Sequence, residues 1–477
     1  MLKKYLTDIA FMQILNLLIK PIWILVIDRA VQNTLSLEVY GNYAALFNFS
    51  LMFFIILDLG LNGYNTTQIS RDTNKIVVLT GNILGLKMIL MAIYVLFVFG
   101  VGAALGYGTA EFLLLVFLCI LQIFTSLNQY LRTIVASLQQ FKWDGIFMVL
   151  DRILVVILCA FLLWGGIEGW SLTIERFIFA QLAGVFLVTF VLVLFLRNYF
   201  RDVRISFDLK TIRPLLQKSW PFALLITLMG LYNYVDSVML KTMVGNAEAG
   251  IYAHGYRLFY AILMFAQIFS GVLLPFFSKN LKDKETINLI ASFTAKFLLL
   301  VAISAALVSA AYSDQIMDVM YHEKATSQSA SSFSFLMFGF IGSVLILVYG
   351  TLLTAALELK YLNTAAFITL CINLLLNTQL IPIYGSTGAA IATAISQVLF
   401  GTICYTISFM VFNFKPLLIN IIKQFFAVGI LCVAIFLGKQ FCSSVSVHLL
   451  MIFITVLIAA YLFKLFQVKD LKTLTRN

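Results

Sequence analysis

The stretch IVVLTGNILGLKMILMAIYVLFVFGV, residues 76–101, decides how this chain has to fold. It is longer than the about 20 residues that a helix needs to cross the hydrocarbon core of a membrane. Its only charged residue is Lys87, near the centre, where a charge is costly unless it has a function or a partner. We therefore expect a membrane protein whose function depends on a few embedded charges.

The composition of the whole chain extends this inference. Of the 477 residues, 62% are hydrophobic and 11% are charged, whereas a soluble domain is about 25% charged. These values exclude a soluble enzyme, a disulfide scaffold and a disordered chain, and short connections leave no room for a soluble catalytic domain. Comparable apolar stretches predict an all-α polytopic membrane protein with about 14 transmembrane helices, at residues 9–30, 39–60, 76–101, 111–136, 146–167, 175–197, 215–240, 249–275, 288–312, 332–356, 360–382, 386–412, 418–438 and 446–466.

The net charge of +11 is distributed unevenly between the two sides of the predicted membrane. With the N-terminus inside, 21 of the 32 Lys and Arg residues lie in cytoplasmic segments, 3 lie in outside segments and 8 lie within the spans. Since cytoplasmic segments are enriched in Lys and Arg, this bias predicts a multi-pass protein with both termini in the cytoplasm. The longest cytoplasmic connection, residues 197–218, is basic, either because it sets the topology or because it is a hinge that contacts anionic lipid head groups.

The sequence contains traces of an internal repeat. The pattern G-x-Y-A occurs at residues 41–44 and again at 250–253, and an aliphatic residue followed by Asp recurs at Asp28 and Asp236 with nearly the same offset. This repeat predicts two parallel six-helix lobes around a central cavity, followed by two C-terminal helices. The predicted segments are an N-terminal lobe at 1–200, a basic cytoplasmic linker at 201–214, a C-terminal lobe at 215–414, and helices 13 and 14 with a cytoplasmic tail at 415–477.

Ionisable residues inside the predicted spans are the candidate functional residues, because burial of charge in lipid is expensive. Eight cations against four or five acids leave a positive excess, which suits an anionic ligand, above all a phosphate. Each cation has an alternative role as a paired or anchoring residue. The cations that we expect to form a substrate-binding cavity are Lys20, Arg29, Lys87, Arg132, Arg152 and Arg257.

The embedded acids are candidates for ion coupling or for pairing with these cations. Export driven by H⁺ or Na⁺ needs an acid that titrates or binds the cation. The candidates are Asp28, Asp58, Asp151 and Asp236.

Two further expectations concern local geometry. Asp236 could pair with Arg257 instead of coupling to an ion. Asp151 and Arg152 are adjacent on a helix, so we expect their side chains not to face each other and not to form a salt bridge. Pro21, beside Lys20, removes a backbone hydrogen bond and predicts a kink that acts as a hinge.

Sequence features of enzymes and metal sites are missing. There is no P-loop motif, no nucleophile–base pair stands out, the three His residues are far apart, and the six Cys residues lie in or beside apolar segments. We therefore expect a secondary transporter, which is not an enzyme and has no metal site or cofactor.

Two parts of the chain resemble a known family. EVYGNYA at 38–44, followed by LDLGLN at 57–62, is similar to the start of bacterial polysaccharide flippases, the O-antigen and capsule repeat-unit exporters. So is LIPIYGSTGAAIATAIS at 380–396, with Asn373 and Asn377 upstream. The resemblance extends over nearly the whole chain in helix count, order and repeat. The family lies within the multidrug/oligosaccharidyl-lipid/polysaccharide exporter superfamily.

The resemblance implies a function. A member of this family flips polyprenyl-diphosphate-linked oligosaccharide from the cytoplasmic to the outer leaflet of the bacterial inner membrane by alternating access. Its product serves the synthesis of cell-surface polysaccharides such as the O-antigen of lipopolysaccharide. Its partners are membrane lipids, a polysaccharide polymerase and assembly proteins, but not nucleic acid, and the last two helices form a groove for the lipid tail. Two alternatives remain, a cation-coupled multidrug exporter of the same superfamily and a non-transporting scaffold subunit of a glycan assembly complex.

Overall fold

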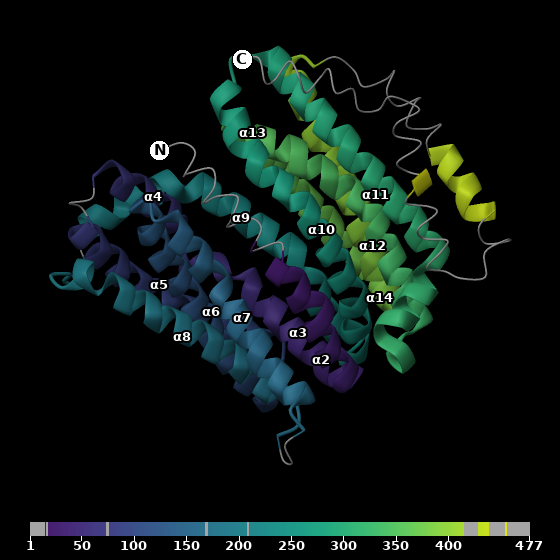
Figure 1. Cartoon of the computed structure of the whole chain (residues 1–477), viewed down its shortest axis with the longest axis horizontal. Helices are drawn as coiled ribbons and strands as arrows, with labels where there is room; N and C mark the ends of the chain where they lie inside the picture. Colours follow the sequence, from purple (N-terminus) through teal and green to yellow (C-terminus); the bar gives the residue numbers. More distant parts are fainter. Residues whose placement is uncertain are drawn as a thin grey trace. The chain divides into compact units, whose positions relative to one another are not determined.

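Helices form all of the regular structure in the part of the chain that the structure describes (Figure 1). The structure is a computed structural model. The predicted all-α class is confirmed. The described residues are 15, 18–72, 76–166, 170–207, 209–414, 428–437 and 454–455, without the side chains of 67, 70, 71 and 209–222.

The helices follow one another with short connections, as the apolar runs predict. Two short elements, η1 and η5, are π-helices, and η2 and η4 are 3₁₀-helices. In chain order the elements are η1 (Trp23–Asp28), α2 (Arg29–Thr34), α3 (Leu37–Met52), η2 (Phe54–Leu57), α4 (Leu61–Arg71), α5 (Ile76–Ala104), α6 (Thr109–Ser137), α7 (Phe141–Trp164), α8 (Ile174–Phe200), α9 (Leu209–Met243), α10 (Asn246–Asn280), α11 (Lys284–Tyr321), η4 (His322–Lys324), α12 (Ser327–Leu345), η5 (Ile346–Gly350), α13 (Thr351–Ala355) and α14 (Leu359–Phe412).

Many of these helices are long and apolar enough to cross a membrane. Among the described residues there are 9, or up to 10 when the bent pair Leu37–Met52 and Phe54–Thr66 is counted as one span. The predicted spans 360–382 and 386–412 both lie in α14, which breaks at Gly385, where a φ of 56° favours glycine. Most of predicted helices 13 and 14, at 415–477, lies outside the described residues, so these two helices stay a prediction.

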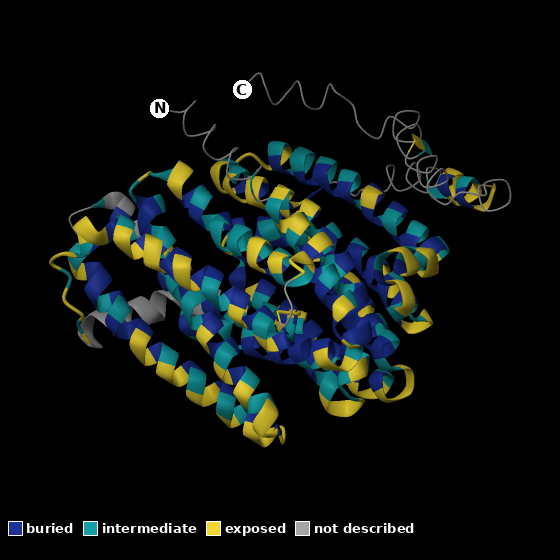
Figure 2. Ribbon diagram, turned by 60° about the horizontal axis from the view of Figure 1, so that its bottom comes forward, coloured by how far each residue is buried: buried dark blue, intermediate teal, exposed yellow. Residues whose placement is uncertain are grey.

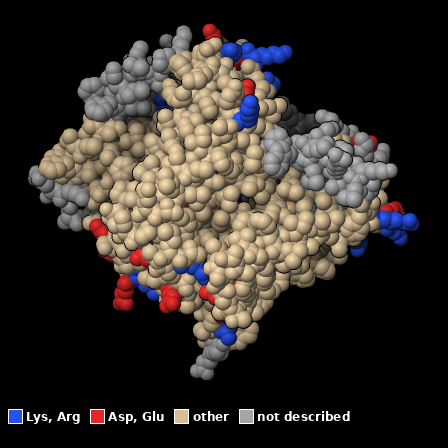
Figure 3. Space-filling view, turned by 180° about the vertical axis from the view of Figure 1, so that it is seen from behind, with Lys and Arg blue, Asp and Glu red and all other residues tan. Residues whose placement is uncertain are grey.

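The surface of the helices is apolar, as a lipid-facing surface has to be. On α8, four large side chains are about half exposed, Phe179, Phe186, Phe190 and Leu194. Figure 2 shows exposed residues along one side of several long helices, and charged side chains are sparse on the face seen in Figure 3. Soluble monomers rarely expose apolar side chains over such a continuous part of their surface. The chain is therefore a multi-pass membrane protein.

The chain forms two compact units, residues 1–253 and 254–477. The first unit includes α9, which packs along α3, and the first turns of α10. The boundaries that we predict for the two lobes, the linker and the C-terminal segment stay predictions.

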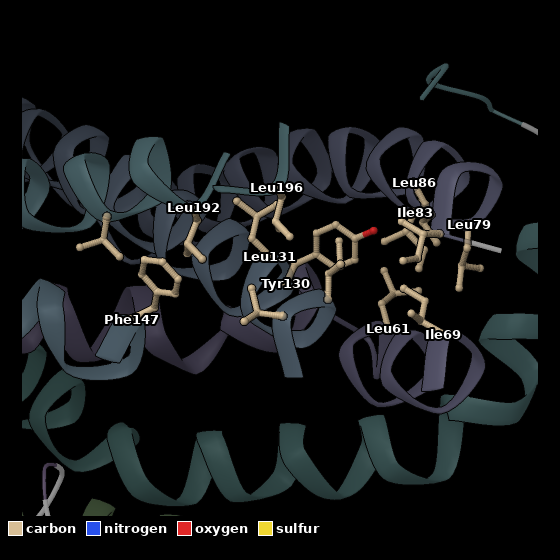
Figure 4. Close-up of a cluster of buried hydrophobic side chains, with 14 of the residues drawn as sticks. Leu61, Ile69, Leu79, Ile83, Leu86, Tyr130, Leu131, Phe147, Leu192 and Leu196 are labelled. Carbon is tan, nitrogen blue, oxygen red and sulfur yellow. The ribbon is translucent and has the colours of Figure 1, made fainter. Parts of the chain in front are cut away.

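A hydrophobic core holds five helices of the first unit together. Leu61 and Ile69 of α4, the α5 side chains, Tyr130 and Leu131 of α6, Phe147 of α7 and the α8 side chains pack in one cluster (Figure 4). Tyr130 is fully buried, and its hydroxyl points toward the α5 side chains. This core packs together the helices that carry several of the polar groups described below.

The two copies of the G-x-Y-A motif lie against each other in the first unit. A Cβ atom added to Gly41 would lie 2.6 Å from the backbone nitrogen of Gly250, and closer still to the carbonyl oxygen of Asn246. A Cβ atom added to Gly250 would likewise meet the backbone of Leu37, at 3.0 Å from its carbonyl carbon. Small residues allow membrane helices to approach to backbone contact. The repeated glycines therefore form one contact between the starts of α3 and α10.

Candidate functional site

Three of the predicted cavity cations lie in one group. Lys20 precedes η1, Arg132 lies on α6 and Arg152 lies on α7. Charge–charge interactions connect Lys20 with Arg152, Arg132 and the acid Asp151. Lys20 is exposed, and the side chain of Arg152 is 38% exposed, so both can meet a ligand. We call Lys20, Arg132 and Arg152 the cationic cluster.

Arg132 is held in place by an acid that sequence reasoning missed. Its Nε atom donates a hydrogen bond of 2.7 Å to Oδ1 of Asp144, which is buried in the first turn of α7. The connection between α6 and α7 is a tight turn that includes Gln139 at a φ of 59°. A short turn brings the end of one helix close to the start of the next. The sequence pattern that could have predicted this pair is an arginine before, and an aspartate after, a short connection between two helices.

Arg152 is placed by an aromatic ring and by its neighbour in sequence. Its guanidinium lies 5.6 Å from the ring centre of Trp23, which stacks on Phe177. Its Nε atom is 3.8 Å from Oδ2 of Asp151, so the expectation that these neighbours do not pair was wrong. The arginine side chain is long enough to reach back to the preceding residue. At 3.8 Å and half-exposed the pair is weak, and the guanidinium has five N–H donors to offer.

Pro21 lies immediately before an unusual turn. The six residues from Trp23 to Asp28 form a π-helix, which is wider than an α-helix and is frequent at functional sites in membrane and soluble proteins alike. Lys20 and Pro21 therefore precede a local irregularity of the first helix, and the kink at Pro21 stays a prediction. The role of Pro21 as a hinge stays a prediction.

The two repeat-related acids have similar surroundings. Asp28 is 2% exposed and accepts hydrogen bonds from the Tyr40 hydroxyl, at 3.0 Å and 3.2 Å, and from Gln32, at 3.1 Å. Asp236 is also 2% exposed and accepts a hydrogen bond of 2.9 Å from the Tyr252 hydroxyl. In each copy a tyrosine of the following long helix thus donates to the acid. The pairing of Asp236 with Arg257, which lies in the second unit, stays a prediction.

Lys87 and Asp58 lie together in a separate polar group. The amino group of Lys87 donates to the carbonyl oxygen of Leu57 and to Oγ of Ser126, both at 2.9 Å, and lies 3.6 Å from Oδ1 of Asp58. The Lys87 side chain has no exposed surface. A ligand cannot reach the amino group in this arrangement. The expected role of Lys87 in the substrate cavity has no contact in the structure to support it and stays a prediction.

Arg29 lines a cavity of about 350 Å³ in the first unit. The rest of the lining comes from η1, from α2 and from the apolar end of α7, and consists of Leu25, Val26, Ala30, Asn33, Thr34, Leu163 and Trp164. Arg257 is half-buried on α10. The roles of these two cations stay predictions.

A polar contact between α3, α6 and α9 was not expected from the sequence. Lys241 was counted as a charge outside the membrane, but its side chain is buried and donates to Asn42 and, at 3.4 Å, to Glu111. Its amino group also lies 4.9 Å from the ring centre of Tyr107. Burial, together with Glu111, raises the pKa of Tyr107, so this hydroxyl stays neutral. Within the described residues, no group of three or more His, Cys, Asp or Glu is arranged to hold a metal ion.

Comparisons with known proteins agree with this architecture. The model of the family described as "Polysaccharide biosynthesis protein" matches residues 6–281. The "Uncharacterized membrane protein MJ1375" of Methanocaldococcus jannaschii is 25% identical over 285 residues, which are 56% of this chain and 64% of that protein. The match thus spans less than two thirds of the relative's length.

Solved structures of transporters are similar to most of the chain. The inward closed conformation of the lipid II flippase MurJ has a TM-score of 0.68 at 16% identity and covers 96% of this chain and 98% of its own. An inward-facing multidrug resistance MATE family transporter of the MOP superfamily has a TM-score of 0.63 at 15% identity, and covers 82% of this chain and 94% of its own. At these identities the likeness shows a shared fold.

Proposed function

Since the chain belongs to the polysaccharide biosynthesis protein family, we propose that it flips polyprenyl-diphosphate-linked oligosaccharide across a membrane by alternating access. The resemblance noted from its motifs is confirmed at the level of the family and superfamily. The same fold serves a flippase and multidrug transporters, so this chain is a transporter rather than an enzyme in our proposal. The direction of transport is from the cytoplasmic to the outer leaflet of a bacterial inner membrane.

The observation that carries this proposal is the cationic cluster. Its members, Lys20, Arg132 and Arg152, have two acid neighbours, Asp144 and Asp151, which leaves one surplus positive charge. A surplus cation in apolar surroundings attracts a diphosphate, because phosphate oxygens accept several charge-assisted hydrogen bonds at once. Arg132 is already paired, so Lys20 and Arg152 are the groups that bind the diphosphate.

The polyprenyl tail and the sugars have separate places in the cycle. The tail stays in the lipid beside helices 13 and 14, while the polar head moves through the protein. The contact of Gly41 with Gly250 closes the outer end while the head is loaded, and it parts for release, which Arg29 and Arg257 guide. Lipids, a polysaccharide polymerase and assembly proteins are the partners in synthesis of cell-surface polysaccharides such as O-antigen.

Energy for the cycle comes from H⁺ or Na⁺ in this proposal. Asp28 and Asp236 are the acids best suited to it, because each is buried and yet hydrogen-bonded to a tyrosine hydroxyl. Loss or gain of a proton, or binding of Na⁺, would change these hydrogen bonds at the ends of two helices. Asp58 and Asp151 are less suited, because each already lies beside a cation.

Translocation in proteoliposomes tests the function. Purified protein is reconstituted with a labelled polyprenyl-diphosphate sugar, and transfer between leaflets is measured with and without H⁺ and Na⁺ gradients. We expect transport by the wild-type chain and by Lys142→Ala, which removes an exposed cation, but strong loss in Lys20→Ala and Arg152→Ala. Transport by the purified chain excludes the scaffold alternative. No transport by the wild type, or full transport by both cluster variants, would refute the proposal.

The second candidate function is a cation-coupled multidrug exporter. The buried carboxylate of Asp28 favours it, because such an exporter needs an embedded acid. A deletion strain discriminates the two functions. Drug sensitivity without loss of surface polysaccharide supports the exporter, and loss of polysaccharide without drug sensitivity supports the flippase.

A further inference from the structure

The second membrane span is broken near the end of its apolar stretch. Helix α3 ends at Met52, and the single 3₁₀ turn of η2 follows. The bend between Leu37–Met52 and Phe54–Thr66 is 47°. Leu59 and Gly60 have φ values of 44° and 85°, and α4 begins at Leu61. A break removes helical partners from backbone carbonyl groups, which have to be satisfied inside the protein because lipid offers no donors.

Lys87 of the neighbouring helix α5 supplies a hydrogen-bond donor to a backbone carbonyl group at this break. Its amino group donates to the carbonyl oxygen of Leu57 at 2.9 Å, which lies within the break. It also donates to the hydroxyl of Ser126 on α6 at 2.9 Å, and that hydroxyl donates to the same carbonyl at 3.2 Å. The ring of Tyr130 lies 5.6 Å from the amino group. One ammonium group thus connects the broken span with two further helices.

Asp58 completes the surroundings of this ammonium group. Its Oδ1 atom lies 3.6 Å from the amino nitrogen of Lys87 and accepts a hydrogen bond of 3.2 Å from the backbone N–H of Asn62. Asp58 therefore joins the cation to the first turn of α4. The positive group has a carbonyl, a hydroxyl and a carboxylate around it. Backbone carbonyls freed by a helix break are the groups that broken membrane helices offer to a bound Na⁺ ion.

We propose that Lys87 is a tethered internal cation that positions the broken second span, and not a ligand of the transported diphosphate. The amino group takes the place that a free monovalent cation would have at such a break, and it cannot leave. The bend of the span is thereby held without an ion from solution. Lys87 is then a positioning residue, and the surplus charge that meets substrate belongs to the cationic cluster.

The charges of Lys87 and Asp58 then depend on each other, which a double substitution can test. Removing one charge leaves the other buried without its partner, whereas removing both leaves a neutral site. In the double variant Lys87→Met, Asp58→Asn, the Ser126 hydroxyl still serves the Leu57 carbonyl. The asparagine oxygen still caps α4 at Asn62.

The experiment compares the two single variants, the double variant and Lys142→Met as a control that removes an exposed cation. Thermal unfolding of each purified protein in detergent gives Tm, and transport in proteoliposomes gives kcat and KM. We expect each single variant to lose Tm and about tenfold or more in kcat with little change in KM. We expect the double variant to regain most of both, and the control to match the wild type.

Two results would overturn the proposal. One is a double variant no more stable than Lys87→Met, or than Asp58→Asn if Lys87→Met cannot be purified. The other is a Lys87→Met variant with unchanged Tm and raised KM, which is the behaviour of a substrate ligand. The transport readout rests on the proposed function, but the Tm comparison does not. A wild-type chain without flippase activity would refute that function and leave the coupling of the two charges measurable.

Discussion

The contact between Gly41 and Gly250 leaves no room for a side chain, so Gly41→Ala is a sharp perturbation of it. The new Cβ would lie 2.6 Å from the backbone nitrogen of Gly250, whereas ordinary contacts begin at 3.4 Å. The starts of α3 and α10 would have to separate by more than about 0.8 Å, because the added Cβ would come closer still to the carbonyl oxygen of Asn246 and a backbone atom cannot rotate away as a side chain can.

The expected cost follows from this overlap. Overpacking of a tight contact costs about 1–3 kcal/mol, which exceeds the gain of about 0.5–1 kcal/mol that alanine brings to a helix. A net loss of about 1–2 kcal/mol lowers the population of the closed contact by about 5- to 30-fold. If closure at this contact is part of the transport cycle, the initial rate of translocation falls by a similar factor.

The assay measures Tm in detergent and the initial rate in proteoliposomes. Gly271→Ala on the same helix α10 is the matched control, because nothing lies within 4 Å of its added Cβ. We also expect Gly250→Ala to resemble Gly41→Ala, and the two substitutions together to cost less than their sum, because they spoil one contact. A Gly41→Ala variant that keeps the Tm and the rate of Gly271→Ala would show that the backbones are not in contact here.

Three further predictions concern single polar contacts. Asp144→Ala leaves the partly buried Arg132 without its acid, so we expect a lower Tm and weaker transport, whereas Asp144→Glu keeps part of both. Tyr40→Phe removes a hydrogen-bond donor from the buried Asp28, and we expect a lower initial rate of transport driven by a proton gradient. A rate equal to that of the wild type would remove this contact from ion coupling. Asp283 caps α11, and hydrogen bonds from the first turn hold the pKa of its carboxyl below the ordinary value, so its stabilising effect is present above about pH 4 and is lost as the pH falls. The difference in Tm between the wild type and Asp283→Ala should therefore shrink on acidification, and a difference independent of pH would contradict this reasoning.

The helices themselves could be predicted from the sequence with little error. Runs of apolar residues such as 76–101 have one stable solution in lipid, a helix whose backbone hydrogen bonds are all internal. The predicted second span ends at residue 60, where its apolar run ends, but the 3₁₀ turn of η2 and the continuation of the chain as the polar helix α4 were not predicted. A helix break of this kind depends on partners from other helices, and those are distant in sequence.

The embedded charges could be found from the sequence, but not their partners. Lys20, Arg132, Arg152 and Lys87 looked alike as cations in apolar stretches, and we expected all of them in one cavity. The structure gathers the first three and places Lys87 in a separate buried group. Which acid pairs with which cation depends on helix rotation and packing, and hydropathy does not report either of these.

Hydropathy and charge along the chain are enough to predict a bundle of membrane helices with a small surplus of embedded positive charge. The sequence also contained the repeat whose glycines meet in the structure. Which charges are exposed and which are neutralised became visible only in the packed helices, because it depends on contacts between side chains distant in sequence, as in the pairs of Lys87 with Asp58 and of Lys241 with Glu111. The free energy of placing an apolar segment in lipid depends on the residues of that segment, so it can be estimated from the sequence. Pairing of two charges needs a short distance between them, and that distance exists only once the helices have packed.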